Sequence, residues 1–94
     1  MLSITNAIYL GNYRIFLSFN DGNSGEANLY DVIFSDLRLP FLPLREENEF
    51  KKFKLEHQTL VWSDELDLAP EFLFFITFRN HPEFQSQFKT WGYI

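Results

Sequence analysis

One stretch constrains the fold of this chain most, a strand-like and then helix-like run interrupted by acids and a proline: residues 60–75, LVWSDELDLAPEFLFF. Around Trp62 the pattern has a period of two, which is typical of a strand with at least one buried face. A residue before proline is pushed out of the α region, whereas proline suits the first position of a helix. We therefore predict a strand at 59–63 with Trp62 as a core anchor, a polar break at 63–67, and a helix from Pro70.

The run after Pro70 is apolar on nearly all sides, with Phe72, Leu73, Phe74, Phe75, Ile76 and Phe78. Periodicity alone cannot separate a buried helix from a buried strand in such a run. The proline start, and Glu71 near the positive end of a helix dipole, favour a helix. A strand at residues 72–79 remains the alternative.

The length and the aromatic content describe a small domain packed with rings. Ninety-four residues predict a single domain, 1–94, with one core. Twelve Phe, four Tyr and two Trp imply that rings dominate the packing. Two interpretations stay open: a core built from Phe, or an exposed aromatic patch or subunit interface.

Composition also excludes several classes of function. The chain has no cysteine, which excludes a disulfide framework, a zinc–thiolate site and a thiol nucleophile. Its 13 acidic residues against 8 basic ones repel a phosphate backbone, so no nucleic-acid partner is expected. No apolar run approaches the ~18 residues that span a bilayer, and no basic region follows Met1, so no membrane is expected either. We expect a cytoplasmic protein.

The N-terminal third predicts an antiparallel meander. Strands at residues 2–10 and 13–20 flank Gly11 and Asn12, and glycine in first place is typical of a type II′ hairpin. The glycine- and asparagine-rich residues 21–25 predict a loop, and residues 26–29 predict a short third strand. Residues 30–37 are compatible with about two helical turns or with irregular structure.

The remaining segments complete an α+β pattern. Residues 39–44 contain two prolines that lack donors, which predicts an extended apolar segment over the core, and residues 45–53 predict a short helix. Residues 53–57 and 59–63 predict a second hairpin that turns at His57 and Gln58. A terminal amphipathic helix should start near Pro82 and end at Gly92. The expected fold is a curved antiparallel sheet of about five strands with short helices.

Two segments carry a family resemblance, FNDGNSGEANLYDVI at residues 19–33 and WSDELDLAPEFLF at residues 62–74, supported by Pro43-Leu44 and the spacing to Phe50 and Phe53. On these motifs the chain resembles the bacterial domain of unknown function 2442 family. The resemblance covers residues 4–75, and WxxxxDLAPExL is its most specific part. Residues 77–94 lie outside it.

The resemblance implies a compact α+β domain similar to the N-terminal half of a two-domain protein whose other half is a helix-turn-helix. It implies no activity. Members look like the partner of a second small protein, in an arrangement similar to toxin–antitoxin pairs. Because the present residues contain no DNA-binding half, the resemblance carries no DNA-binding role to this chain.

Catalytic and metal-binding candidates are few. The one dense acidic group is Asp64, Glu65, Asp67 and Glu71, and it lacks the glycine of a calcium loop. Its simplest roles are in the turn and the helix start, with Asp67 accepting backbone donors. His57 and His81 have no metal-ligand spacing, and no serine lies in a nucleophile elbow. We expect no enzyme activity, no metal and no cofactor.

Protein contact is therefore the predicted function. Binding candidates are the aromatic and acidic residues Trp62, Asp64, Asp67, Phe84, Phe88 and Trp91. The acidic charge favours a small basic protein as the partner. The alternative is a small-ligand or regulatory domain with a pocket beneath residues 39–44.

The terminal segment raises a second partner, a copy of this chain. Phe84, Phe88 and Trp91 recur at i, i+4 and i+7 and form an apolar stripe that must be covered. Packing onto the chain's own sheet would cover it, and so would a symmetric homodimer.

Overall fold

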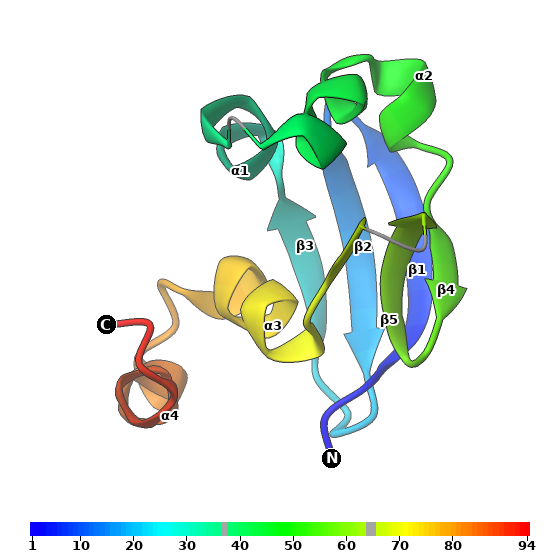
Figure 1. Ribbon diagram of the computed structural model, residues 1–94. Coiled ribbons are helices and arrows are strands. Elements are labelled where there is room, and N and C mark those ends of the chain that lie inside the picture. The colour runs from blue at the N-terminus through cyan, green and yellow to red at the C-terminus, as the bar shows by residue number, and fades with distance from the viewer. Residues whose placement is uncertain (37, 64–65) are drawn as a thin grey trace.

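The computed structural model describes residues 1–36, 38–63 and 66–94 of an α+β fold with two three-stranded antiparallel sheets (Figure 1). The first sheet has the order β1-β2-β3 and the second the order β4-β5-β6. The strands are β1 (Ile4–Gly11), β2 (Arg14–Phe19), β3 (Ser24–Asn28), β4 (Lys54–Glu56), β5 (Thr59–Ser63) and β6 (Leu66–Leu68). The α+β class is confirmed, although the strands form two sheets where one curved sheet was predicted.

Six helical segments connect and cover the strands in the described residues. They are α1 (Tyr30–Ser35), η1 (Leu39–Arg45), α2 (Glu47–Phe50), α3 (Pro70–Phe78), η2 (Pro82–Phe84) and α4 (Gln85–Trp91), with η1 and η2 being 3₁₀ helices. None of the helices described is long and apolar enough to cross a bilayer. The helix alternative for residues 72–79 is the one that the structure adopts, and α3 begins at Pro70 as predicted.

The first sheet has one apolar face and one mixed face. On β2, Ile15, Leu17 and Phe19 are buried, whereas the alternating residues are only partly covered. The mixed face includes the cross-strand row Ile8, Phe16 and Glu26. Along β2, alternate residues therefore face the core and the mixed face of the sheet.

Both hairpin turns contain residues with positive φ, which residues other than glycine rarely adopt. Gly11 pairs with the first residue of β2, so the two loop residues are Asn12 (φ 54°) and Tyr13 (φ 64°). Positive φ at both loop residues is the requirement of a type I′ turn, so the predicted type II′ turn at Gly11-Asn12 is wrong. The second turn, at His57 (φ 51°) and Gln58 (φ 68°), lies where it was predicted.

Strand β6 was not predicted, because the acidic residues in and around it indicated a turn. Leu66 and Leu68 are buried, and Asp67 between them is exposed, which is the alternation of a short strand. β6 pairs with β5, and the Thr59 hydroxyl donates a hydrogen bond to the Leu68 carbonyl. The prediction that Asp67 fixes a turn is therefore wrong, since Asp67 lies in a strand. Residues 64 and 65 lie outside the described residues.

The segment predicted to be extended, residues 39–44, lies within the 3₁₀ helix η1. Proline is tolerated in the first turn of a helix, where its missing N–H would have had no partner, and Pro40 occupies that place. The Phe41 N–H donates to the Arg38 carbonyl over 3.0 Å, which starts the 3₁₀ pattern of i to i+3 bonds. The helix predicted at 45–53 is shorter than expected, since α2 covers Glu47–Phe50.

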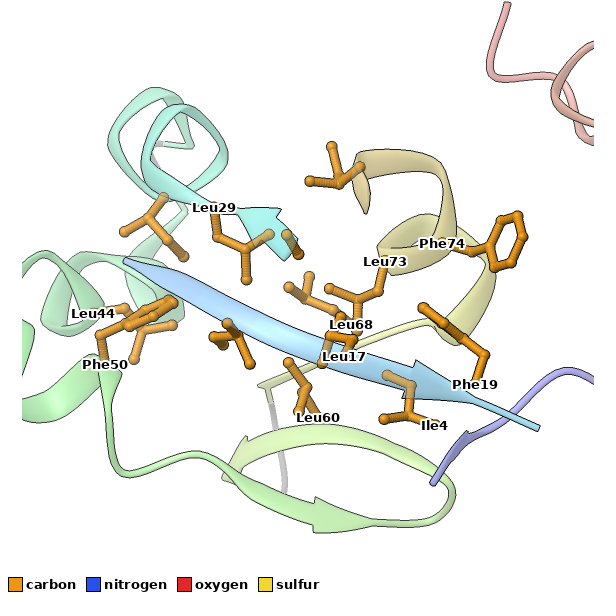
Figure 2. Packing of buried hydrophobic residues seen from close by; sticks show 14 of the residues in the cluster. Ile4, Leu17, Phe19, Leu29, Leu44, Phe50, Leu60, Leu68, Leu73 and Phe74 are labelled. Atoms are coloured by element: carbon orange, nitrogen blue, oxygen red, sulfur yellow. The ribbon is translucent and has the colours of Figure 1, made fainter. Parts of the chain in front are cut away.

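The core lies against the apolar face of the first sheet. Figure 2 shows Leu17 and Phe19 of β2 among side chains from α3, the second sheet and the segment η1–α2. Six phenylalanines are buried: Phe19, Phe41, Phe50, Phe74, Phe78 and Phe88. The other six are partly buried and none is exposed, so the interpretation of a core built from Phe is confirmed.

The C-terminal segment covers its own aromatic stripe, and it does so against α3 and not against a sheet. The ring centroid of Phe74 lies 5.0 Å from that of Phe84 and 5.9 Å from that of Trp91. Phe88 is fully buried and lies 5.1 Å from Phe75. Gly92, with φ of 86°, ends α4 as predicted. Self-association through this segment stays a prediction.

Gly25 offers a test of how closely α3 approaches β3. A Cβ at Gly25 would lie 2.9 Å from Cγ2 of Thr77 and 3.2 Å from Cε1 of Phe78. We expect Gly25→Ala to lower the free energy of unfolding by about 1–3 kcal/mol, the usual cost of overpacking, measured by urea denaturation. Ser24→Ala, at the exposed neighbouring position, should change it by less than about 0.5 kcal/mol. A stabilised Gly25→Ala protein would contradict the close packing.

Candidate protein-interaction surface

The 3₁₀ helix η1 sorts its apolar residues into rows, because side chains three positions apart lie above one another. Phe41 and Leu44 form the inner row and are only 3% and 4% exposed. Leu39 and Leu42 form an outer row and are 78% and 37% exposed. A period of three in LPFLPL was the signal for this arrangement, and our sequence reasoning missed it. We call Leu39 and Leu42 the η1 ridge.

A groove borders the ridge between η1 and β6. Two adjacent pockets of about 200 Å³ each share Pro40 and Leu66 in their lining. One pocket extends toward Pro43 and Trp62, and the other toward Leu68. We call the two pockets together the η1–β6 groove. Its walls combine apolar residues with charged ones, among them Arg38 and Asp67 in one pocket and Glu49 and Lys52 in the other. Pro40, between Leu39 and Leu42 in the chain, lines both pockets.

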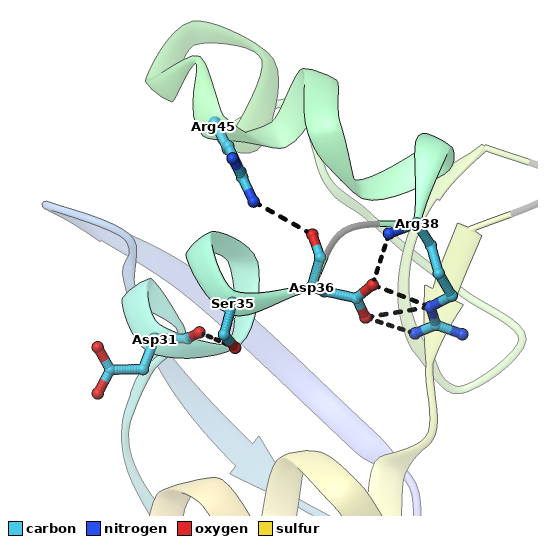
Figure 3. Close-up of polar contacts among 5 residues, drawn as sticks. All are labelled: Asp31, Ser35, Asp36, Arg38 and Arg45. Carbon is cyan, nitrogen blue, oxygen red and sulfur yellow. Dashed lines mark hydrogen bonds and ion pairs between the residues drawn. The ribbon is translucent and has the colours of Figure 1, made fainter.

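Two arginines tie η1 to the end of α1 (Figure 3). Arg38, just before η1, forms an ion pair with Asp36 over 2.7 Å between Nη2 and Oδ2. Hydrogen bonds from Arg38 lower the pKa of the Asp36 carboxyl. At the other end of η1, Nη2 of Arg45 donates to the carbonyls of Phe34 and Asp36 over 3.2 and 3.3 Å. Both ends of η1 therefore make polar contacts with Asp36, just after α1.

A second set of polar contacts ties the segment after η1 to the first hairpin. The Tyr9 hydroxyl and the Asn12 N–H both donate to the Glu47 carboxylate, the latter over 3.1 Å. The Tyr13 hydroxyl donates to the Arg45 carbonyl over 2.6 Å. The hydrogen bond from Tyr9 is the main cause that lowers the pKa of Glu47, whereas burial, followed by the bond to Glu47, raises the pKa of Tyr9.

Trp62 lies where the core meets the groove. Its Nε1–H donates to the Phe50 carbonyl over 2.7 Å. Its ring lies 5.7 Å from that of Phe50 and 6.4 Å from that of Phe53, measured between centroids. Because Trp62 is half-buried and also lines the groove, it combines the core role that was predicted with a surface that a partner could reach.

Charges around the groove are largely paired. Lys52 forms an ion pair with Glu49 over 3.0 Å, and Arg38 is held by Asp36. Asp67, which lines the same groove, has no ion-pair partner among the described residues. The Asp67 carboxylate therefore gives the groove a negative charge that no ion pair among the described residues neutralises.

The other candidates from the sequence do not form a site. His57 lies in the turn between β4 and β5, while His81 lies between α3 and η2, with Nδ1 3.5 Å from Oε1 of Glu83. Glu71 is in the first turn of α3. Among the described residues, no group of three or more acidic or histidine side chains could hold a metal ion. Asp64 lies outside the described residues.

The packing of Trp62 can be measured separately from its hydrogen bond. We expect Trp62→Phe to lower the free energy of unfolding by about 1 kcal/mol, because the Phe50 carbonyl loses its donor while most of the packing remains. Trp62→Ala should cost about 3 kcal/mol, the lower end for a large buried aromatic. Urea denaturation followed by the fluorescence of Trp91 measures both. A cost below about 1 kcal/mol for Trp62→Ala would show that the ring does not pack on the core.

The lowered pKa of Glu47 predicts a loss of stability in acid. The ordinary carboxyl pKa is 4.5, so the contacts of the ionised Glu47 favour the folded state above that value and are lost as the pH falls through the lower folded pKa. The difference in urea midpoint between the natural chain and Glu47→Gln should be constant above about pH 6 and shrink between about pH 5 and pH 3. Tyr9→Phe should remove much of this dependence. A difference that does not shrink as the pH falls below 4.5 would contradict the assignment to Glu47.

Comparison with known proteins identifies the family. The family model described as a protein of unknown function (DUF2442) matches residues 4–77, which confirms the resemblance expected over residues 4–75. No curated protein and no solved structure matches the chain. Because the match covers most of the sequence and ends within α3, the chain belongs to this family of proteins of unknown function.

Proposed function

We propose that this chain is a non-catalytic protein-interaction module that binds its partner through the η1 ridge and the η1–β6 groove. The carrying observation is the exposure of Leu39, 78%, on a helix whose two ends make polar contacts with Asp36 and which borders the η1–β6 groove. Exposed apolar side chains that adjoin a concave surface are typical of protein contact sites. A segment already folded as a helix loses less conformational entropy on binding than an unfolded segment does.

The size of the groove fits either a protein partner or a metabolite. Its two adjoining pockets of about 200 Å³ each together fall within the roughly 300–1,000 Å³ that is usual for small-molecule pockets. One observation supports the alternative, a small-ligand or regulatory domain. The pocket next to Trp62 is lined by Pro40, Pro43 and Leu44, which is the segment where the sequence suggested such a pocket.

Charge suggests the chemistry of the partner. The chain carries a net charge of −5, and the cations beside the groove are already paired. A basic partner would be attracted over distance and could place a cation near Asp67. We propose a small basic protein, in an arrangement similar to a toxin–antitoxin pair. A cysteine-free chain is consistent with a reducing compartment, and the cytoplasm is the one that we propose.

The η1 ridge can be tested by placing charge on it. We expect the natural chain, tagged and purified from its host, to carry a stoichiometric small basic polypeptide, and Leu39→Asp with Leu42→Asp to lose it. Leu55→Asp is the matched control, since Leu55 is an exposed leucine (42%) on β4 outside the ridge. Circular dichroism should show that all three proteins are folded.

Two results would contradict this proposal. One is a partner that the doubly substituted chain retains as well as the natural chain does. The other is the absence of any protein partner together with a strong stabilisation by a metabolite in a thermal-shift screen. The second result would favour the ligand-binding alternative.

A further inference from the structure

The outer side of α3 packs against the aromatic C-terminal segment. Rings of Phe72, Phe74 and Phe75 on α3 contact rings of the C-terminal segment. The closest of these contacts is the stack of Phe75 on Tyr93, with centroids 4.9 Å apart. In the described part of the chain, every ring contact of Phe84, Phe88, Trp91 and Tyr93 is with α3 or lies within residues 81–93. The aromatic side of α4 is therefore recognised by α3.

A short exposed linker decides where α4 docks. Arg79 still has helical angles, φ −58° and ψ −24°, but His81 is extended, with φ −87° and ψ 121°. A residue before proline avoids the α region, so Pro82 explains the break after α3. The amide of Gln85 donates to the carbonyls of Arg79 and His81 over 2.8 and 2.9 Å, which holds the turn closed.

The segment that docks is separate from the shared domain. The family match ends at residue 77, one residue before the end of α3, and α4 lies beyond it. Figure 1 shows α4 on the side of α3 that faces away from the sheets. An appended helix that binds through one face and one short linker can make the same contacts with an α3 from another molecule.

We propose that the outer face of α3 is a self-recognition site, which holds α4 of its own chain when the turn at His81–Pro82 is closed and α4 of a second copy when that turn opens. The open form continues α3 through the linker into α4 as one helix of residues 70–91, about 33 Å long at 1.5 Å per residue. That helix carries its aromatic stripe away from its own α3. Two such chains then exchange their α4 helices and restore all the ring contacts.

Linker length and proline set the balance between the two forms. A short linker gives α4 an effective concentration in the millimolar range at its own α3, which favours the closed monomer at micromolar protein. Proline is strongly disfavoured inside a helix, so Pro82 further opposes the open form. The site is separate from the η1 ridge, and its failure would leave the proposed function untouched.

Replacing Pro82 tests the inference on the full chain. We expect Pro82→Ala to lower the concentration at which dimers form by roughly 10,000-fold, about 100-fold for each of the two linkers that the dimer opens, because alanine lets the helix continue. Light scattering after size exclusion measures this change. Pro43→Ala, the same change in η1, should stay monomeric like the natural chain. Adding Leu39→Asp to Pro82→Ala should leave the dimer unchanged, because the η1 ridge takes no part in the exchanged contacts.

A second measurement needs no substitution. The natural chain, refolded from urea at millimolar concentration and then diluted, should contain dimers that convert slowly to monomers, while refolding at micromolar concentration should give monomers only. A Pro82→Ala chain that folds and stays monomeric would overturn the inference. Refolding that gives only monomers at both concentrations would overturn it too.

Discussion

The apolar face of β2 is the constraint on which the rest of the structure depends. Ile15 and Leu17 lie at the centre of a three-stranded sheet and are completely buried. Burying a side chain of this size stabilises the folded state by roughly 1.5–3 kcal/mol, which is lost wherever water reaches the face. A sheet of three short strands cannot close on itself. Three separate covers therefore meet over it: α3, the second sheet, and the segment η1–α2 (Figure 2).

The cover made by η1 and α2 explains why a ridge is exposed at all. A 3₁₀ helix with an apolar residue in every row buries one row, here Phe41 and Leu44, and must leave another in solvent. Hydrogen bonds from Arg38, Arg45 and Tyr9 hold this cover in position from both sides. The polar contacts that stabilise the fold thus also orient Leu39, and fold and proposed function rest on the same contacts.

Helix α3 has a different position, because its rings contact both the first sheet and the C-terminal segment. Phe74 contacts Phe19 of the sheet on one side and Phe84 of the C-terminal segment on the other, with centroids 5.1 and 5.0 Å apart. A helix of this kind is stable only between two layers. The family domain supplies one layer, and residues beyond the family match supply the second. In the proposed exchange, the linker between α3 and α4 determines whether this second layer comes from the same chain or from a second copy of the chain.

The sequence by itself determined the features whose cause is local: the alternation on β2, the start of α3 at Pro70, and the end of α4 at Gly92. The spacing of apolar residues sets the first, and the steric properties of a single residue set the other two. Only the tertiary structure decided that the strands form two sheets, that Asp67 lies in β6, and that η1 is helical and presents Leu39 to solvent. Each of these features depends on packing against residues that are far apart in the chain. Such contacts leave no periodic pattern in the sequence.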